Sequence, residues 1–215
     1  AYAARPYNYS LFAPKGSLQG KCSERYYRFC IDTAQKLGTD SICIDLWGAL
    51  LDGDPAGQYE NCLEMLAVLA TYAKERNCAI IVGNVSNSCS ALFNTLDEVQ
   101  HMKRDIHMDN LKIALDIGAA LDNGEDIRGW LNTFDKDLSM IYLADGRSTG
   151  TGYPLGFGCY PVGRILGLLQ EYGYGGTVAI KMDREKNELD PAHTDQINIS
   201  YLDRRLGSAS IDIIT

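Results

Sequence analysis

Five short, mostly apolar segments recur along the chain, and their spacing constrains the fold more than any other feature of the sequence. Each segment is apolar over most of its length, which is typical of strands that are covered on both faces. Parallel sheets contain such strands, because the helices that connect the strands also cover the sheet. The five predicted strands are residues 41–46, 78–82, 111–116, 138–143 and 177–181.

The segments between these strands have the spacing of amphipathic helices, with apolar residues three and four positions apart. Gly38 follows the first of them and suits the left-handed residue that ends a helix. Ser90 is expected to cap a helix that runs through Leu96 and Val99, and Pro161 is expected in the first turn of another. The other predicted helices cover residues 24–37, 58–76, 125–131 and the segment after Pro191.

Strand followed by helix, repeated through the chain, predicts right-handed β-α-β units and an α/β fold in one domain over residues 1–215. An open doubly wound sheet and a (β/α) barrel both fit this order. No G-x-G-x-x-G or G-x-x-x-x-G-K-[ST] sequence follows a predicted strand, which favours the barrel. Both architectures place their sites at the carboxyl ends of the strands, so the residues there are the candidate functional residues.

The charge and the cysteine content restrict the partners and the location of the protein. Its formal charge of −8 repels phosphate backbones, so no nucleic acid partner is expected. The seven cysteines are odd in number and contain no C-x-x-C pair, so neither a disulfide framework nor a zinc site is predicted. Free thiols fit a reducing compartment. Without a signal peptide pattern or an apolar run of about 18 residues, the chain is expected to be cytoplasmic and to have no membrane partner.

An ordered series of short motifs resembles one family over nearly the whole chain. The motifs include YNY at residues 7–9, NTLDE at 94–98, LDIGAAL at 115–121, IYLADG at 141–146 and PLGFG at 154–158. In this order they resemble the xylose-isomerase-like TIM-barrel superfamily, and within it the ketose 3-epimerases, including fructoselysine-type epimerases. The resemblance implies a (β/α)8 TIM barrel and a sugar isomerase or epimerase that acts on or binds a small sugar or sugar derivative.

The resemblance also implies that two further strand–helix units precede the matched part in the family. Here the YNY segment, which lies beyond the third strand in the family, stands at residues 7–9. A barrel without two strands would leave two apolar sheet edges unpaired. We therefore expect either residues outside this sequence or a partner chain to cover the edges, and we expect a homo-oligomer.

In the family, a divalent metal such as manganese is held by Glu, Asp, His and Glu at the ends of four strands, and it polarises the oxygens of the sugar. These positions fall on Gly83, Asp116, Tyr142 and Lys181. Glycine has no side chain, a phenol rarely binds such metals, and an ammonium group repels them. One carboxylate does not hold a divalent ion tightly, so no metal site and no cofactor are expected.

Two interpretations of these positions involve the lysine. In the first, the ammonium group of Lys181 replaces the charge of the metal and pairs with Asp116, which leaves a divergent protein with altered or lost activity. In the second, Lys181 is a catalytic Schiff-base nucleophile or base, and Tyr142 is its proton donor. A neighbouring Asp116 opposes this role, because a carboxylate raises the pKa of a lysine.

A third interpretation is a sugar-binding pocket without chemistry. Its candidate substrate-binding residues are Asn84, Trp47, Asp145 and Arg147, which offer hydrogen bonds to hydroxyl groups and an indole ring to stack on a sugar. Local turn hydrogen bonds are the alternative role for Asn84. The loop of residues 146–152 either cradles a phosphate with Arg147 or is a plain flexible loop. A non-catalytic scaffold subunit, or pseudoenzyme, is also consistent with the changed metal positions.

Overall fold

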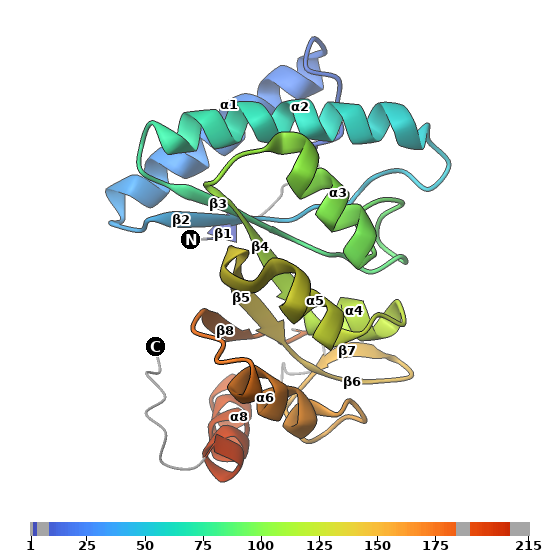
Figure 1. Cartoon of the computed structure of the whole chain (residues 1–215), viewed down its shortest axis with the longest axis vertical. Helices are drawn as coiled ribbons and strands as arrows, with labels where there is room; N and C mark the ends of the chain where they lie inside the picture. The colour runs from blue at the N-terminus through green and yellow to red at the C-terminus, as the bar shows by residue number, and fades with distance from the viewer. Residues whose placement is uncertain (1, 4–8, 184–189, 207–215) are drawn as a thin grey trace. The chain divides into compact units, whose positions relative to one another are not determined.

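The computed structural model describes residues 2–3, 9–183 and 190–206, and the chain separates into two compact units, residues 1–141 and 142–215 (Figure 1). Tyr7 and Asn8 of the YNY segment lie outside the described residues. The expectation of a single domain over residues 1–215 stays a prediction.

Parallel strands form the centre of the first unit. Their order is β1-β2-β3-β4, and each pairs with the next in parallel. Three of them were expected and β1 was not. Ile44 lies opposite Val82, and Val82 lies opposite Ile113, so apolar side chains share one face of the sheet. The strands are β1 (Tyr2–Ala3), β2 (Ser41–Ile44), β3 (Ala79–Gly83) and β4 (Leu111–Asp116).

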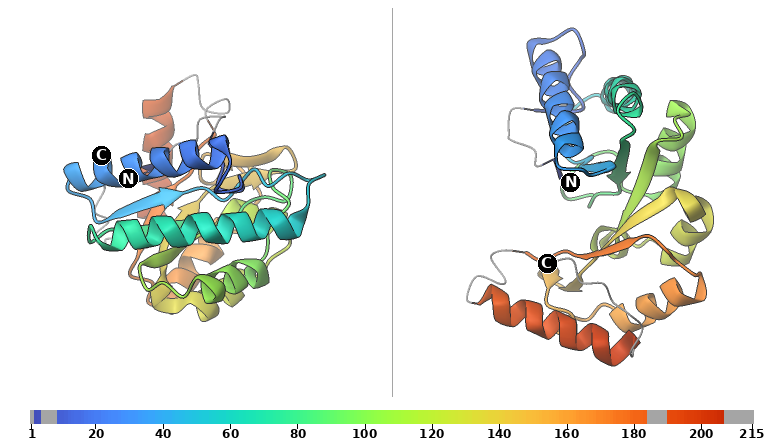
Figure 2. Two further views of the ribbon diagram at one scale, coloured as in Figure 1. Left: turned by 90° about the horizontal axis from the view of Figure 1, so that it is seen from above. Right: turned by 90° about the vertical axis from the view of Figure 1, so that its left-hand side faces the viewer.

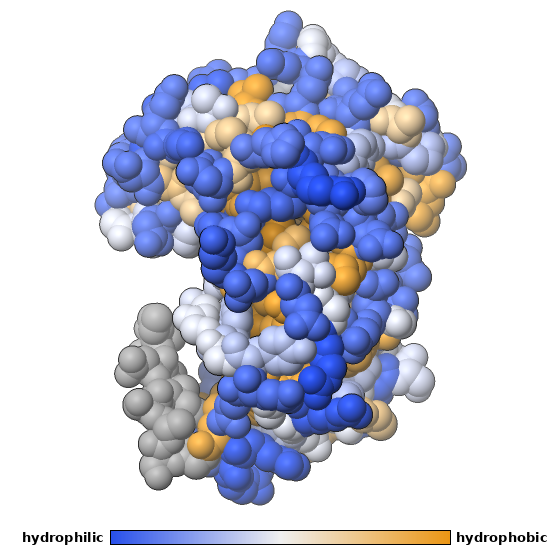
Figure 3. Space-filling view, in the orientation of Figure 1, coloured by the Kyte–Doolittle hydropathy of each residue, from blue (hydrophilic) through white to orange (hydrophobic). Residues whose placement is uncertain are grey.

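Helices cover one face of these strands, and Figures 1 and 2 show α1, α2 and α3 side by side along it. The core lies between them, where Ile80, Val82 and Leu66 are fully buried. Hydrophilic residues cover most of the outer face of this unit seen in Figure 3. The helical elements are α1 (Leu18–Lys36), α2 (Pro55–Lys74), α3 (Leu96–Ile106), α4 (Ile117–Asp122), α5 (Ile127–Phe134) and the 3-10 turn η1 (Asp135–Asp137).

The first residues of the helices differ from the prediction, because capping side chains determine where each helix begins. Ser17 and Asp54 cap α1 and α2, so both helices begin earlier than their apolar periodicity indicates. The prediction that Ser90 caps the third helix is wrong. Thr95 caps α3 in a capping box with Glu98, whereas the buried hydroxyl of Ser90 accepts the N–H of Ala49 at 3.2 Å.

A charge network lies in the first unit beside the start of β4. The ammonium group of Lys112 lies 2.6 Å from Asp137 Oδ1, and that of Lys103 lies 3.4 Å from Asp137 Oδ2. Burial opposes the charge of Asp137, but the hydrogen bonds and positive charges of Lys112 and Lys103 together outweigh burial and lower the pKa of Asp137. Burial also lowers the pKa of Lys103. These lysines are therefore paired within the framework.

The second unit contains the end of β5 (Leu138–Leu143), beside which β8 (Thr177–Ile180) lies. The N–H of Lys181 donates to Leu143 O at 2.8 Å. An antiparallel hairpin that was not predicted joins β6 (Asp145–Arg147) to β7 (Gly150–Tyr153). The predicted helices are present as α6 (Val162–Glu171), with Pro161 just before it, and α8 (Pro191–Leu206). None of the described helices is long and apolar enough to span a bilayer.

Candidate functional site

The carboxyl ends of β3 and β4 are tied together by the side chain of Asn84. Its Nδ2 donates to Asp116 O at 3.0 Å, and its Oδ1 accepts the N–H of Asp116 at 2.7 Å. The amide therefore pairs with Asp116 as a peptide group of a strand would. Asn84 is 4% exposed, so both bonds are buried. This gives Asn84 a structural role, while its contact with substrate stays a prediction.

Asp116 is held from two sides at the end of β4. Besides the two main-chain bonds to Asn84, its Oδ1 accepts the N–H of Ala119 at 3.0 Å and so caps α4. The residue is 6% exposed. The one carboxylate among the four positions is thus buried and held in place by neighbouring backbone.

Gly83 lies at a close approach between β3 and β4. A Cβ atom at this position would stand 2.7 Å from Ala114 O and 3.1 Å from Ala114 Cβ. The first distance is well below van der Waals contact with a backbone atom that cannot rotate away. Any side chain at position 83 would therefore push the two strands apart. The position offers neither a ligand atom nor room for one.

Trp47 lies in the segment after β2 and is 39% exposed, so part of its indole is accessible in the first unit. Cys89, in the loop after β3, is also exposed. Neither observation tests a role in sugar binding. Stacking of a sugar on Trp47 stays a prediction.

In the second unit, the ends of β5 and β8 bring Tyr142 and Lys181 together. The ammonium nitrogen of Lys181 lies 6.0 Å from the centre of the Tyr142 ring, at the outer limit of a cation–π contact. Lys181 is exposed. Its role as a Schiff-base nucleophile, and its pairing with Asp116 of the first unit, stay predictions.

Asp145 organises the loop that follows β5. Oδ1 accepts the N–H groups of Gly146 at 2.8 Å and Tyr160 at 3.1 Å. Oδ2 accepts those of Gly156 and Gly158, both at 2.9 Å. The residue is 1% exposed. Four main-chain donors thus converge on one buried carboxylate, which is a structural role in addition to the predicted contact with substrate.

The P-x-G-x-G sequence of residues 154–158 follows from this arrangement. Gly156 has a φ of 86°, which favours glycine, and a Cβ at Gly158 would collide with the Asp145 carboxylate. The sequence reading missed the role of Asp145. The sequence did contain a signal for it. Asp145 closely follows a predicted strand and precedes the glycine-rich residues 154–158, whose main-chain N–H groups need a hydrogen-bond acceptor.

Arg147 is bound to the same loop. Its guanidinium group donates two hydrogen bonds to Phe157 O, one of them from Nε at 2.7 Å, and lies 4.8 Å from the centre of the Tyr153 ring. Residues 146–152 form part of the β6–β7 hairpin, so the interpretation as a plain flexible loop is wrong. A phosphate cradle and a contact from Arg147 to substrate stay predictions.

The residues at the four strand ends do not fit a divalent metal. They supply one carboxylate, one phenol and one ammonium group, and the fourth position is a glycine without room for a side chain. Across the ranges 2–3, 9–183 and 190–206, no cluster of three or more His, Cys, Asp or Glu side chains is arranged to hold a metal ion. The expectation that no cofactor is bound stays a prediction.

Comparison with known proteins finds the same fold in one protein family and in several solved structures. Residues 3–203 match the family described as xylose isomerase-like TIM barrel. No curated protein matches the sequence. Among solved structures, D-psicose 3-epimerase from Clostridium cellulolyticum H10 with D-tagatose has a TM-score of 0.77 at 19% identity, covering 92% of this chain and 73% of that one.

Two further structures are similar to the same degree. A 3-keto-D-glucoside 4-epimerase from E. coli has a TM-score of 0.75 at 15% identity, covering 93% of this chain and 76% of that one. The IOLI protein with a bound zinc atom has a TM-score of 0.77 at 16% identity, covering 95% of this chain and 77% of that one. At such identities the similarity shows the fold.

Proposed function

Because the chain belongs to the xylose isomerase-like TIM barrel family, we propose that it is a divergent sugar isomerase- or epimerase-like protein that binds a small sugar without the family's metal site. The family match confirms the α/β barrel class and the resemblance expected from the sequence. Two of the similar structures are epimerases of sugars or sugar derivatives, which supports a small carbohydrate as the ligand.

The close approach at Gly83 carries the proposal that the metal site is lost. A ligand side chain at this position would have to displace Ala114 O, which belongs to the hydrogen-bonded strand β4. A side chain at position 83 therefore requires a shift of the β4 backbone as well as the change of residue. Asn84, which pairs with Asp116, keeps the two strand ends in this position.

In the proposal, the remaining side chains bind the sugar directly. In the first unit, the Asp116 carboxylate accepts a hydrogen bond from a sugar hydroxyl group. The exposed part of Trp47 packs on an apolar face of the sugar. A lysine keeps a positive charge where the family places a metal ligand, but it does not supply a Lewis acid. The alternative is a non-catalytic scaffold subunit that binds no sugar.

The test is to titrate the purified chain with D-tagatose by calorimetry and to assay formation of the 3-epimer by chromatography. Both measurements are made with added manganese and, separately, with EDTA. We expect binding of equal affinity in the two buffers and no epimer in either. Trp47→Ala should weaken binding, because the apolar contact with the exposed part of the indole is lost, and Leu37→Ala, at another exposed apolar residue of the first unit, serves as control.

Epimer that forms with manganese and disappears with EDTA would overturn the loss of the metal site. Absence of binding in both buffers would overturn sugar binding and favour the scaffold alternative. The cytoplasmic location and the homo-oligomeric state expected from the sequence stay predictions.

A further inference from the structure

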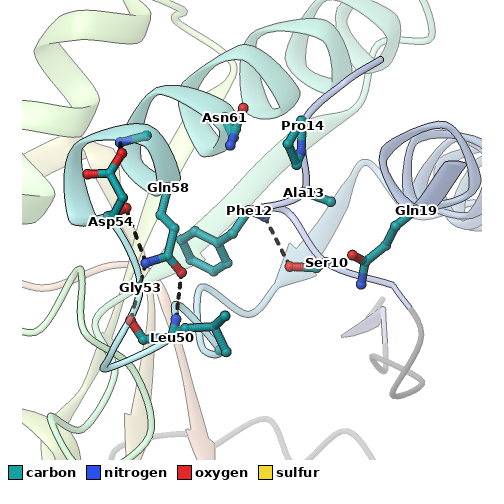
Figure 4. A pocket seen from close by; sticks show the side chains of 12 residues that line it. Ser10, Phe12, Ala13, Pro14, Gln19, Leu50, Gly53, Asp54, Gln58 and Asn61 are labelled. Atoms are coloured by element: carbon teal, nitrogen blue, oxygen red, sulfur yellow. Dashed lines mark hydrogen bonds between the residues drawn. The ribbon is translucent and has the colours of Figure 1, made fainter. Parts of the chain in front are cut away.

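A pocket of about 500 Å³ lies in the first unit (Figure 4). Its walls come from residues 10–14, from residues 48–54 between β2 and α2, and from the first turns of α1 and α2. None of Gly83, Asn84 and Asp116 lines it. Its volume is in the range of small-molecule sites in proteins. We call it the loop pocket.

Hydrogen bonds within the protein fix the residues that line the loop pocket. Gln58 clamps the segment after β2 to helix α2, since its Oε1 accepts the N–H of Leu50 at 2.6 Å and its Nε2 donates to Leu50 O at 3.2 Å. Asp54 accepts the N–H groups of Ala56 and Gly57 at 3.1 Å each. Phe12 is 6% exposed, and its ring stacks on that of Phe93. A ligand would therefore meet a site that is largely formed in advance.

Two other amides of the loop pocket are available to a ligand. Gln19 on α1 and Asn61 on α2 line it, and Figure 4 shows them on either side of Phe12. Within the described residues, neither side-chain amide makes a hydrogen bond, in contrast to that of Gln58. Each amide carries one acceptor oxygen and two donor hydrogens. Each amide can therefore bind a group that both donates and accepts, as a hydroxyl does.

The described residues that line the loop pocket carry no side-chain charge that would attract an anion. Asp54 is the one charged side chain among the described lining residues, and both of its carboxylate oxygens accept backbone N–H groups of α2. Among the described residues, no lysine or arginine lines the pocket, so these residues offer a phosphate or carboxylate ligand no counter-charge. Phe12, Ala13 and Leu50 supply apolar surface. A neutral molecule with many hydroxyl groups and an apolar face fits these properties.

We propose that the loop pocket is a second sugar site, which binds a neutral, unphosphorylated sugar through the amides of Gln19 and Asn61. The choice of a sugar over other neutral polyols rests on the proposed function, whereas the place of the site rests on the two available amides and the lack of cations among the described lining residues. The sugar at this site is bound and not transformed.

The test is a titration of the isotope-labelled chain with D-tagatose, with maltose and with D-fructose 6-phosphate, followed by NMR of the side-chain amides. We expect saturable shifts of the Gln19 and Asn61 signals with the two neutral sugars and much weaker binding of the phosphate. Gln19→Ala and Asn61→Ala should each raise the Kd at this pocket by about 2- to 12-fold. Gln35→Ala is the matched control, because Gln35 is an exposed glutamine near the other end of α1, and it should leave the Kd unchanged.

The signal of Asn84 separates the two proposals, since it reports on the strand ends. Shifts at Asn84 alone, unaffected by Gln19→Ala and Asn61→Ala, would overturn the loop pocket and leave the proposed function standing. Shifts at Gln19 and Asn61 alone would support the loop pocket and count against a site at the strand ends. Equal binding of the sugar phosphate at the loop pocket, or no saturable shift at all, would overturn the loop pocket.

Discussion

Replacing Asp145 with Asn is expected to lower the free energy of unfolding of the second unit by about 3–5 kcal/mol. The carboxylate accepts four main-chain N–H groups from a position that is 1% exposed. The asparagine amide has one acceptor oxygen, which can serve one pair of N–H groups. Its NH2 group would face the other pair, and two donors cannot form a hydrogen bond with each other. At least two charge-assisted bonds are lost, and their donors stay buried. Urea unfolding followed by circular dichroism measures the effect.

The matched control for this variant is Asp195→Asn, an exposed aspartate on α8 of the same unit, which should change stability by less than about 0.5 kcal/mol. Amide hydrogen exchange locates the damage, because Gly156 and Gly158 should lose protection in Asp145→Asn and keep it in the control. A variant as stable as the original chain, with both glycines still protected, would show that Asp145 does not organise this loop.

The replacement of Asn84 by Ala is expected to cost about 2–4 kcal/mol of stability in the first unit. The substitution leaves the buried N–H and C=O groups of Asp116 without the partners that lie at 2.7 and 3.0 Å. It also removes the link that fixes the end of β4 beside β3. We therefore expect weaker binding of D-tagatose at the strand ends as well as a lower urea midpoint.

Asn87→Ala is the control for Asn84→Ala, because Asn87 is an exposed residue of the same type three positions further on, and its side chain makes no hydrogen bond with the described residues. It should leave both the urea midpoint and the sugar affinity close to those of the original chain. If Asn84→Ala behaves like this control, the amide does not hold the strand ends.

The strands were predictable from the sequence because buried strands consist mostly of apolar residues. Residues 111–116 and 138–143 are apolar nearly throughout, and the structure has β4 and β5 over these same residues. The capping residues were harder, since polar residues in a loop compete for the role. Thr95 and Glu98 form the T-x-x-E pattern of a capping box, which is the better signal than the hydroxyl of Ser90 alone. Helix α4, of six residues, is too short to show a periodicity.

The candidate site was predictable in position and not in detail. Residues at strand ends can be located once the strands are known, as for Gly83 and Asp116. Asn84 and Asp116 are 32 positions apart in the sequence, and no sequence motif predicts that they form hydrogen bonds. The loop pocket is likewise built from segments that are separate in sequence, with amides whose availability becomes visible only when the neighbours of Gln19 and Asn61 are known.

The loss of the metal site is tested most directly by the metal content of the purified chain, measured by elemental mass spectrometry after incubation with manganese and desalting. The single carboxylate of Asp116 and the close approach of Ala114 at Gly83 predict that no divalent ion is retained above the level of a denatured control. About one manganese ion per chain would contradict the proposal, because it would mean that Asp116 has partners in a metal site after all.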